Sequence, residues 1–234
     1  MQIAGLEKNS VVDYPGKIAA VVFTPGCNLD CYYCHNRLLL EKDPRPDLLP
    51  EQDVLSFLEK RRKLLDGVVI SGGEPTLQKD LTGFITKVKS LGYRVKLDTN
   101  GTNPVVLKEL LAKRLIDYVA MDLKAPFAKY GQICGNDSFL ERIKTSIELL
   151  LSGQVAYEFR TTFVPELTEE DLLEMAKLIQ GARLYALQQY RLPELPVDEK
   201  KALRLQQPSH NPNYIRQIAE KIAEVVEVCE TRGI

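Results

Sequence analysis

The chain has 234 residues, of which 44% are hydrophobic and 27% charged, and its formal net charge is -1. A chain of this length and composition can bury a sizeable core, and its balanced charge gives no electrostatic footprint for nucleic acid or an anionic membrane. It contains no apolar run of the roughly 20 residues that a membrane span needs. Because no secretory signal follows Met1 either, we expect a cytoplasmic protein.

Short runs rich in β-branched residues alternate with longer amphipathic segments along the chain. The runs predict six strands, at 18–23, 67–70, 94–97, 118–121, 157–164 and 184–187. Apolar residues spaced by three and four predict helices over 54–65, 81–88, 105–115, 143–151, 172–179 and 215–226.

Six consecutive strand–helix units predict an α/β fold, in which a sheet of parallel strands is covered by outer helices. Six units are too few for the closed eight-stranded barrel, so we expect a partial (βα)6 barrel; a flat doubly wound sheet would give a similar pattern. We expect one domain over 1–234, with a core of about 15–190 and a C-terminal loop and helix over 191–234. The stretch from Tyr190 to Pro212 predicts a long surface loop, a kind of segment that is often functional.

Three of the five cysteines lie within eight residues, in a C-x3-C-x2-C loop shortly after the first predicted strand. This arrangement of Cys27, Cys31 and Cys34 favours a metal or catalytic site over a disulfide framework. Four-iron clusters ordinarily take four cysteines, so three thiolates would leave one iron open. The amino and carboxylate groups of a methionine could chelate that iron.

A closed zinc site is the alternative interpretation of the cysteine loop. His35 is a poor fourth ligand because it is adjacent to Cys34, so Cys134 or Cys229 would have to complete the site. Outside such a site, we expect Cys134 and Cys229 to be small apolar residues of the interior.

The segment from Cys27 to Asn36, which ends Cys34-His35-Asn36, resembles the radical S-adenosylmethionine superfamily. The match runs from Asp13 to about Gln189 and is strongest with the activating enzymes of glycyl radical enzymes. Among these, the chain is most similar to the short-form activating proteins of anaerobic ribonucleoside-triphosphate reductase. The resemblance implies a [4Fe-4S] cluster on Cys27, Cys31 and Cys34 that cleaves S-adenosylmethionine, and hence an oxidoreductase.

The resemblance also implies a set of cofactor-binding residues at successive strand ends. The Gly72-Gly73-Glu74 segment would hold the amino group of the methionine moiety, and Tyr33 would lie against the adenine. The charged residues expected near the cofactor are Asp122, Lys124 and Arg160. Taken singly, these residues could equally form a tight turn, a helix cap or a surface ion pair.

Two further features come from the similar pyruvate formate-lyase activating enzyme. Asp98 and Thr99 match positions that bind a monovalent cation there together with a main-chain carbonyl, which would be that of Ala120 here. Gln188 stands where that enzyme has a cofactor-contacting histidine, so this contact departs from the pattern.

The activase signature corresponds to Asp13-Tyr14-Pro15-Gly16, just before the first predicted strand. The family more often has Asp-Gly-Pro-Gly, so Tyr14 is a departure. The resemblance implies that this loop binds the glycine-bearing segment of a partner enzyme. The simpler interpretation is a Pro-Gly turn leading into a strand.

The leading hypothesis is therefore an activase that generates a glycyl radical on a partner, first of all anaerobic ribonucleotide reductase. Its chemistry requires a small electron donor such as flavodoxin or ferredoxin. One alternative is an activase of pyruvate formate-lyase or of another glycyl radical enzyme. Others are a radical enzyme acting on a small molecule, or a non-catalytic protein that carries electrons or binds zinc.

Overall fold

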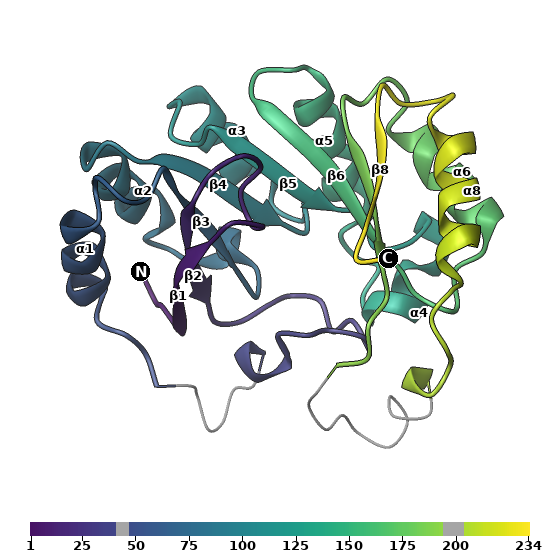
Figure 1. Cartoon of the computed structure of the whole chain (residues 1–234), viewed down its shortest axis with the longest axis horizontal. Helices are drawn as coiled ribbons and strands as arrows, with labels where there is room; N and C mark the ends of the chain where they lie inside the picture. Colours follow the sequence, from purple (N-terminus) through teal and green to yellow (C-terminus); the bar gives the residue numbers. More distant parts are fainter. Residues whose placement is uncertain (41–46, 194–203) are drawn as a thin grey trace.

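The computed structural model describes residues 1–40, 47–193 and 204–234, which form an eight-stranded curved sheet with helices along its outer side (Figure 1). The strand order in space follows the chain, and all pairs are parallel except the antiparallel pair of β1 and β2. The strands are β1 (Gly5–Ser10), β2 (Ala19–Thr24), β3 (Gly67–Gly72), β4 (Arg94–Thr99), β5 (Tyr118–Asp122), β6 (Ala156–Phe163), β7 (Tyr185–Gln189) and β8 (Cys229–Arg232). The predicted α/β partial barrel of parallel strands is confirmed.

The helices follow the strands in the predicted alternation. They are α1 (Glu51–Lys60), α2 (Leu81–Ser90), α3 (Pro104–Ala112), α4 (Tyr130–Cys134), α5 (Leu140–Leu151), α6 (Glu169–Leu178) and α8 (Pro212–Ile222), with short 3-10 turns at Arg37–Leu39, Pro75–Leu77 and Phe127–Lys129. Their starts use ordinary capping chemistry: Thr168 and Asp171 form a capping box before α6, and Pro104 and Pro212 occupy the first helical turn of α3 and α8. No helix in the described ranges has the length and apolarity to cross a membrane.

The six predicted strands correspond to β2 through β7, and the sequence analysis missed one strand at each edge of the sheet. β1 and β8 are short, and neither contains a buried residue. They therefore lack the apolar runs by which the inner strands were recognised. The prediction that only a loop and a helix follow residue 190 is wrong, because β8 extends the parallel sheet beyond α8. Part of the predicted loop from Tyr190 to Pro212 lies outside the described residues, at 194–203.

The inner strands bury both faces, as parallel strands covered by helices do. Along β2, Ala20 and Val22 pack in the large core between sheet and helices, whereas Ala19 and Val21 face the inside of the barrel. There they form a small second cluster with Val69 and with the ring of Tyr14, which precedes β2. Tyr14 also packs against Tyr118, with ring centroids 5.9 Å apart. The barrel interior is thus filled by side chains near the start of its strands.

The loops that follow the parallel strands meet at the opposite end, where ligand sites of this architecture lie. The loop after β2 carries the three cysteines and is anchored to α4, since the Asp30 N–H donates to the Cys134 carbonyl at 2.8 Å. The loops after β3, β4 and β5 carry the other predicted motifs. The curved sheet therefore brings segments about 100 residues apart to one rim.

Candidate functional site

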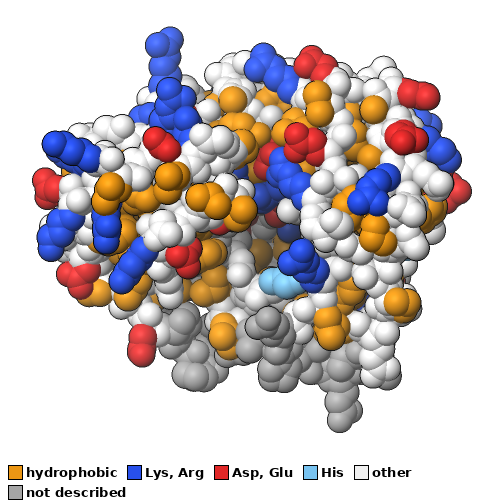
Figure 2. Space-filling model, viewed as in Figure 1, with side chains coloured by type: hydrophobic (Ala, Val, Ile, Leu, Met, Phe, Trp, Pro, Cys, Tyr) orange, Lys and Arg blue, Asp and Glu red, His pale blue; other side chains and the backbone are white. Residues whose placement is uncertain are grey.

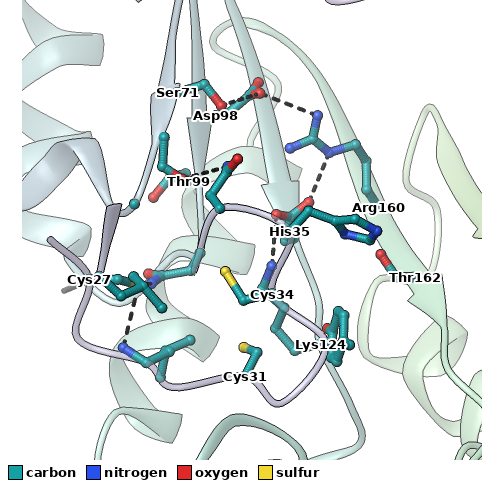
Figure 3. A pocket seen from close by; sticks show the side chains of 18 residues that line it. Cys27, Cys31, Cys34, His35, Ser71, Asp98, Thr99, Lys124, Arg160 and Thr162 are labelled. Atoms are coloured by element: carbon teal, nitrogen blue, oxygen red, sulfur yellow. Dashed lines mark hydrogen bonds and ion pairs between the residues drawn. The ribbon is translucent and has the colours of Figure 1, made fainter. Parts of the chain in front are cut away.

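One pocket at this rim contains most of the predicted site residues (Figure 3). The face of the molecule in Figure 2 is hollowed in its middle, where acidic and basic side chains gather. The predicted residues that line the pocket are Cys27, Cys31, Tyr33, Cys34, Gly72, Gly73, Asp98, Thr99, Asp122, Lys124 and Arg160. Further lining residues are Leu29, His35, Asn36, Leu40, Ser71, Asn100 and Thr162. Glu74, Gln188 and the loop from Asp13 to Gly16 do not line it.

The cysteine loop is held by backbone hydrogen bonds that leave its thiols facing the pocket. Gly26 N–H donates to the Leu39 carbonyl at 2.6 Å, and Cys34 N–H to the Cys31 carbonyl at 3.1 Å. The Leu29 N–H donates to Cys27 Sγ at 3.4 Å, and burial raises the pKa of the Cys27 thiol to about 12. Cys31 is buried, and Cys27 and Cys34 are partly exposed to the pocket.

The remaining two cysteines lie outside the pocket. Cys134 is fully buried in the core, as predicted. Cys229 is partly buried on β8. Among the described residues, no group of three or more His, Cys, Asp or Glu side chains is arranged to hold a single metal ion.

The two glycines after β3 are required by close packing against the end of β2. Gly72 has φ +114°, and a Cβ there would lie 2.4 Å from the Thr24 nitrogen. A Cβ on Gly73 would lie 2.0 Å from the Gly26 carbonyl oxygen. The segment is fixed by the Gly73 N–H donating to Thr24 and the Glu74 N–H to Gly26, both at 2.8 Å. These contacts couple the predicted cofactor segment directly to the start of the cysteine loop.

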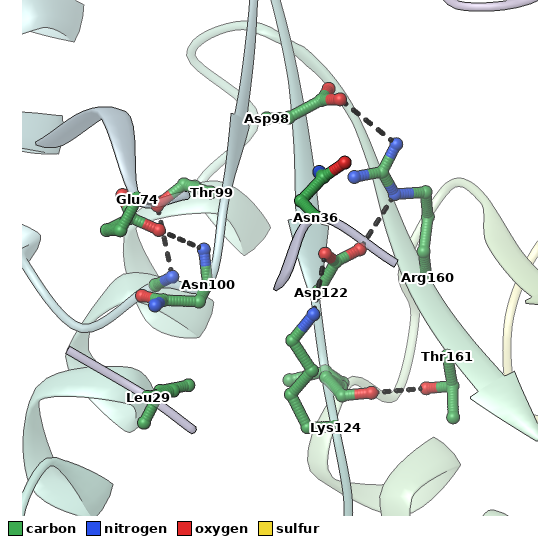
Figure 4. Close-up of polar contacts among 12 residues, drawn as sticks. Leu29, Asn36, Glu74, Asp98, Thr99, Asn100, Asp122, Lys124, Arg160 and Thr161 are labelled. Carbon is green, nitrogen blue, oxygen red and sulfur yellow. Dashed lines mark hydrogen bonds and ion pairs between the residues drawn. The ribbon is translucent and has the colours of Figure 1, made fainter. Parts of the chain in front are cut away.

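The Glu74 side chain points away from the pocket and is fully buried (Figure 4). Its carboxylate accepts hydrogen bonds from the Thr76 N–H at 3.1 Å and hydroxyl at 2.5 Å, from the Thr99 hydroxyl at 2.8 Å and from the Asn100 N–H at 2.7 Å. Burial raises the pKa of Glu74 in spite of these donors. Glu74 thus joins the loops after β3 and β4, and any contact of this segment with a ligand comes from its backbone.

Charged side chains from β4, β5 and β6 form a continuous row along the pocket, which we call the charge row: Lys96, Asp98, Asp122, Lys124 and Arg160. Arg160 Nε donates to Asp122 Oδ1 at 2.8 Å, and its Nη1 lies 3.5 Å from Asp98 Oδ2. Lys124 Nζ donates to Asp122 Oδ2 at 2.9 Å, and Lys96 pairs with Asp98. Lys96 is buried and does not line the pocket. The members that do are two cations, Lys124 and Arg160, and two carboxylates, so their charges balance.

The pairs within the charge row keep Asp98, Asp122 and Lys124 ionised although the site is buried. Burial alone would raise the pKa of Asp122, but Arg160 and Lys124 outweigh it and hold that pKa well below its usual range. Arg160 and Lys96 likewise lower the pKa of Asp98. Conversely, burial would lower the pKa of Lys124, and the neighbouring Asp122 raises it.

Tyr33 supplies an observation that fits a ligand in this pocket. Its side chain lines the pocket, yet its buried hydroxyl has no hydrogen-bond partner within residues 1–40, 47–193 and 204–234. A buried hydroxyl without a partner is costly, so a bound molecule that supplies one is favoured. Three soft thiols, the backbone at Gly72 and Gly73, and the cations Lys124 and Arg160 together suit a four-iron cluster with an amino-acid ligand.

The predicted partner loop lies at the other end of the barrel, before β2. Since β2 spans six residues, at about 3.3 Å per residue, this loop and the cysteine loop are roughly 20 Å apart. Pro15 and Gly16 are exposed and Asp13 is partly exposed, with its carboxylate accepting from the Ser10 hydroxyl at 2.5 Å. Tyr14 is only 3% exposed and fills the barrel interior, so its ring serves packing.

The sequence analysis missed several polar residues of the site. Lys96 could have been noticed as a lysine within a buried strand, a position that demands a charge partner. Asn28, Asn36 and Asn100 gave no periodic signal, although Asn28 and Asn100 are each next to a predicted residue. The Asn36 amide donates to the Gly72 carbonyl at 3.0 Å, which ties the end of the cysteine loop to the glycine segment.

The parallel partial barrel and the cysteine pocket are the features expected of a radical S-adenosylmethionine enzyme, and comparison of the sequence with known families gives the same class. The model of the radical SAM superfamily matches residues 21–179, so the chain belongs to that superfamily. Membership implies a four-iron cluster and S-adenosylmethionine as cofactors.

Individual relatives narrow the comparison. The chain is 40% identical over 231 residues to a Methanocaldococcus jannaschii protein named "Putative glycyl-radical enzyme activating enzyme", covering 95% of this chain and 91% of the relative. It is 30% identical over 173 residues to the 7-carboxy-7-deazaguanine synthase of Clostridium acetobutylicum, covering 73% and 72% of the two chains. Among solved structures, Streptococcus suis SuiB bound to S-adenosylmethionine shares the fold, with a TM-score of 0.69 and 16% identity. The matched region covers 91% of this chain and 52% of the SuiB chain, so this chain spans about half the length of SuiB.

Proposed function

We propose that Cys27, Cys31 and Cys34 hold the cluster, and that the chain is an activase that generates a glycyl radical on a partner enzyme. The observation that carries this proposal is the shared pocket, in which three thiols of one loop face the Gly72–Gly73 backbone and the charge row. The 40% identity to the Methanocaldococcus jannaschii protein over nearly the whole chain supports the activase assignment.

In this proposal the residues of the chain position the cofactor and exclude water. The bound cluster supplies the electron that breaks a carbon–sulfur bond of S-adenosylmethionine. The Gly72 and Gly73 backbone would hold the amino group of the methionine moiety, and a cation of the charge row, Lys124 or Arg160, would pair with its carboxylate. Tyr33 lies against the adenine. No general acid or base is needed because the key step moves a hydrogen atom, so placement within the pocket is the main contribution of the protein.

A monovalent cation at Asp98 and Thr99, completed by the Ala120 carbonyl, belongs to the same proposal. The pairing of Asp98 with Ala120 across β4 and β5 supports this part of the proposal. Asp98 is also held by Lys96 and Arg160. We expect the affinity for S-adenosylmethionine to fall when potassium and sodium are replaced by choline; equal affinity in all three salts would contradict an occupied cation site.

The partner in this proposal is anaerobic ribonucleoside-triphosphate reductase, with flavodoxin or ferredoxin as the electron donor in the cytoplasm. The second candidate is a radical enzyme acting on a small molecule, which the 30% identity to a deazaguanine synthase favours. The higher identity and coverage of the activase relative make the first candidate the stronger one.

Anaerobic incubation with S-adenosylmethionine, reductant and the reductase tests the proposal. Electron paramagnetic resonance should detect a glycyl radical on the partner, and 5'-deoxyadenosine should form with it. The Cys31→Ala variant should lose both signals, whereas Cys229→Ala, which removes a cysteine outside the pocket, should keep them. Cleavage without a partner radical would refute the partner, and cleavage by Cys31→Ala would refute the cluster ligands.

A further inference from the structure

Asn100, directly after β4, connects the cysteine loop with the buried Glu74. The side-chain amide of Asn100 lies 3.7 Å from Cys27 Sγ and donates to Asn28 Oδ1 at 3.0 Å. Its Oδ1 accepts from the Thr102 N–H at 3.0 Å and hydroxyl at 2.7 Å. All four contacts are made by one carboxamide that is 5% exposed.

The orientation of this carboxamide is fixed by its neighbours. Thr102 donates two hydrogen bonds to Oδ1, so that atom is the oxygen and the amide nitrogen must face Asn28 and Cys27. The Asn100 backbone N–H is held by Glu74 Oε2 at 2.7 Å, which fixes the residue from the opposite side. The Asn28 amide, in turn, donates to the Thr102 hydroxyl at 2.8 Å. The network leaves the Asn100 amide directed at the sulfur.

We propose that Asn100 is a positioning residue that raises the reduction potential of the cluster through its hydrogen bond to Cys27 Sγ. This inference rests on the cluster ligands proposed above but not on the partner. Reduction places more negative charge on the cluster sulfurs, and a donor at a sulfur stabilises the reduced form more than the oxidised form. The backbone donor at Leu29 contributes independently of any side chain.

The test is a redox titration of the reconstituted holoenzyme, monitored by electron paramagnetic resonance without S-adenosylmethionine or a partner. Asn100→Asp keeps the acceptor for Thr102 but replaces the N–H donor by a negative charge. Asn100→Ala removes the donor and the acceptor together and adds no charge. At the wild-type midpoint potential, the ratio of reduced to oxidised cluster should fall about tenfold in Asn100→Asp, equivalent to about 59 mV for one electron, and about threefold in Asn100→Ala.

Asn103→Ala is the matched control, because the Asn103 amide comes from the same loop and donates to the Thr76 carbonyl at 2.9 Å. Its midpoint should equal that of the wild type. Unchanged midpoints in both Asn100 variants, or an equal shift in Asn103→Ala, would overturn the proposal. Loss of the glycyl radical on the partner with these shifts intact would count only against the activase assignment.

A measurement on the wild type avoids dependence on variant folding. Protein labelled with 15N at the asparagine side-chain amides is reduced and studied by pulsed electron–nuclear double resonance. The proposal expects a 15N coupling from the amide that contacts Cys27, and this coupling should vanish in Asn100→Ala. A reduced wild-type cluster without such a coupling would refute the hydrogen bond.

Discussion

At the scale of single residues, Gly73 allows two loops to pack closely because it has no side chain. We expect Gly73→Ala to lower the free energy of unfolding by about 1–3 kcal/mol, because its Cβ would collide with the Gly26 carbonyl and the backbone must move. The displaced segment should also weaken S-adenosylmethionine binding at least tenfold. Urea unfolding and isothermal titration check the two effects.

Gly83→Ala is the control for this substitution. Gly83 lies within α2, and nothing lies within 4 Å of a Cβ added there. The exchange should stabilise the protein by about 0.4–1 kcal/mol and leave cofactor affinity unchanged. Equal behaviour of the two alanine variants would contradict the role assigned to Gly73.

Asp122 is the carboxylate on which the charge row depends, because it pairs with both Arg160 and Lys124. Asp122→Asn would leave two buried cations without their main partner. We expect a loss of about 3 kcal/mol in unfolding free energy, the lower end for a broken buried pair since a quarter of the side chain is exposed. Glu109→Gln, which breaks the exposed pair with Lys113, should leave unfolding unchanged within error. Similar losses in both variants would argue against a special role of the charge row.

The carboxylates of Asp98 and Asp122 make the stability of the fold depend on pH in the acidic range. The folded-state pKa values of Asp98 and Asp122 lie below the ordinary value of about 3.9, because Arg160, Lys96 and Lys124 outweigh the effect of burial. Their contribution is therefore complete above about pH 4 and is lost as the pH falls further. Urea midpoints at pH 7, 5, 4 and 3 should fall mainly in the last step. Asp122→Asn should show a shallower fall, and a decline of equal slope would exclude this origin.

At the scale of secondary-structure elements, β8 is attached to the barrel by a buried ion pair. Arg232 donates to both carboxylate oxygens of Glu158, at 3.1 and 2.7 Å, and the Glu158 side chain is 1% exposed. Arg232→Met should lower the free energy of unfolding by about 3 kcal/mol, because it removes the charged partner of this buried carboxylate. The Tm should fall by roughly 6–12 °C. Arg216→Met on the exposed side of α8 is the matched control. A thermal scan in which both variants melt together would refute the attachment.

Those elements also show what the sequence could and could not predict. The strands β2 to β7 were recognised because burial of both faces leaves continuous apolar runs, and the motifs at their ends followed from the parallel topology. β1 and β8 were not predicted because an edge strand needs no continuous run of apolar residues. The hydrogen bond between Asn100 and Cys27 joins residues 73 positions apart. A periodic pattern of apolar residues cannot predict a single side-chain contact between segments so far apart in the sequence.

At the scale of the whole molecule, the barrel separates the candidate cofactor pocket from the predicted partner loop. The cysteines and the charge row lie at the carboxyl end of the strands, whereas Asp13, Pro15 and Gly16 lie roughly 20 Å away at the other end. Beside them, Val11 and Val12 are 72% and 83% exposed, and these two adjacent side chains add an apolar surface to the predicted loop. Hydrogen-atom transfer needs contact with the pocket, so this loop cannot itself hold the glycine that is to react. We propose that it contacts another part of the partner, and changes in it should affect partner affinity without altering the cofactor site.

We accordingly expect Val12→Glu to weaken binding of the partner enzyme about tenfold, since it puts a charge into an apolar contact. Formation of 5'-deoxyadenosine without the partner should stay at the wild-type rate, because the substituted residue is far from the pocket. Surface plasmon resonance under anaerobic conditions and product quantification measure the two quantities. Val105→Glu is the control, as Val105 is 75% exposed on α3, distant in sequence from this loop. Unchanged partner affinity in Val12→Glu would show that the partner binds at another surface. Slower formation of 5'-deoxyadenosine without the partner would show that the two ends of the barrel are not independent.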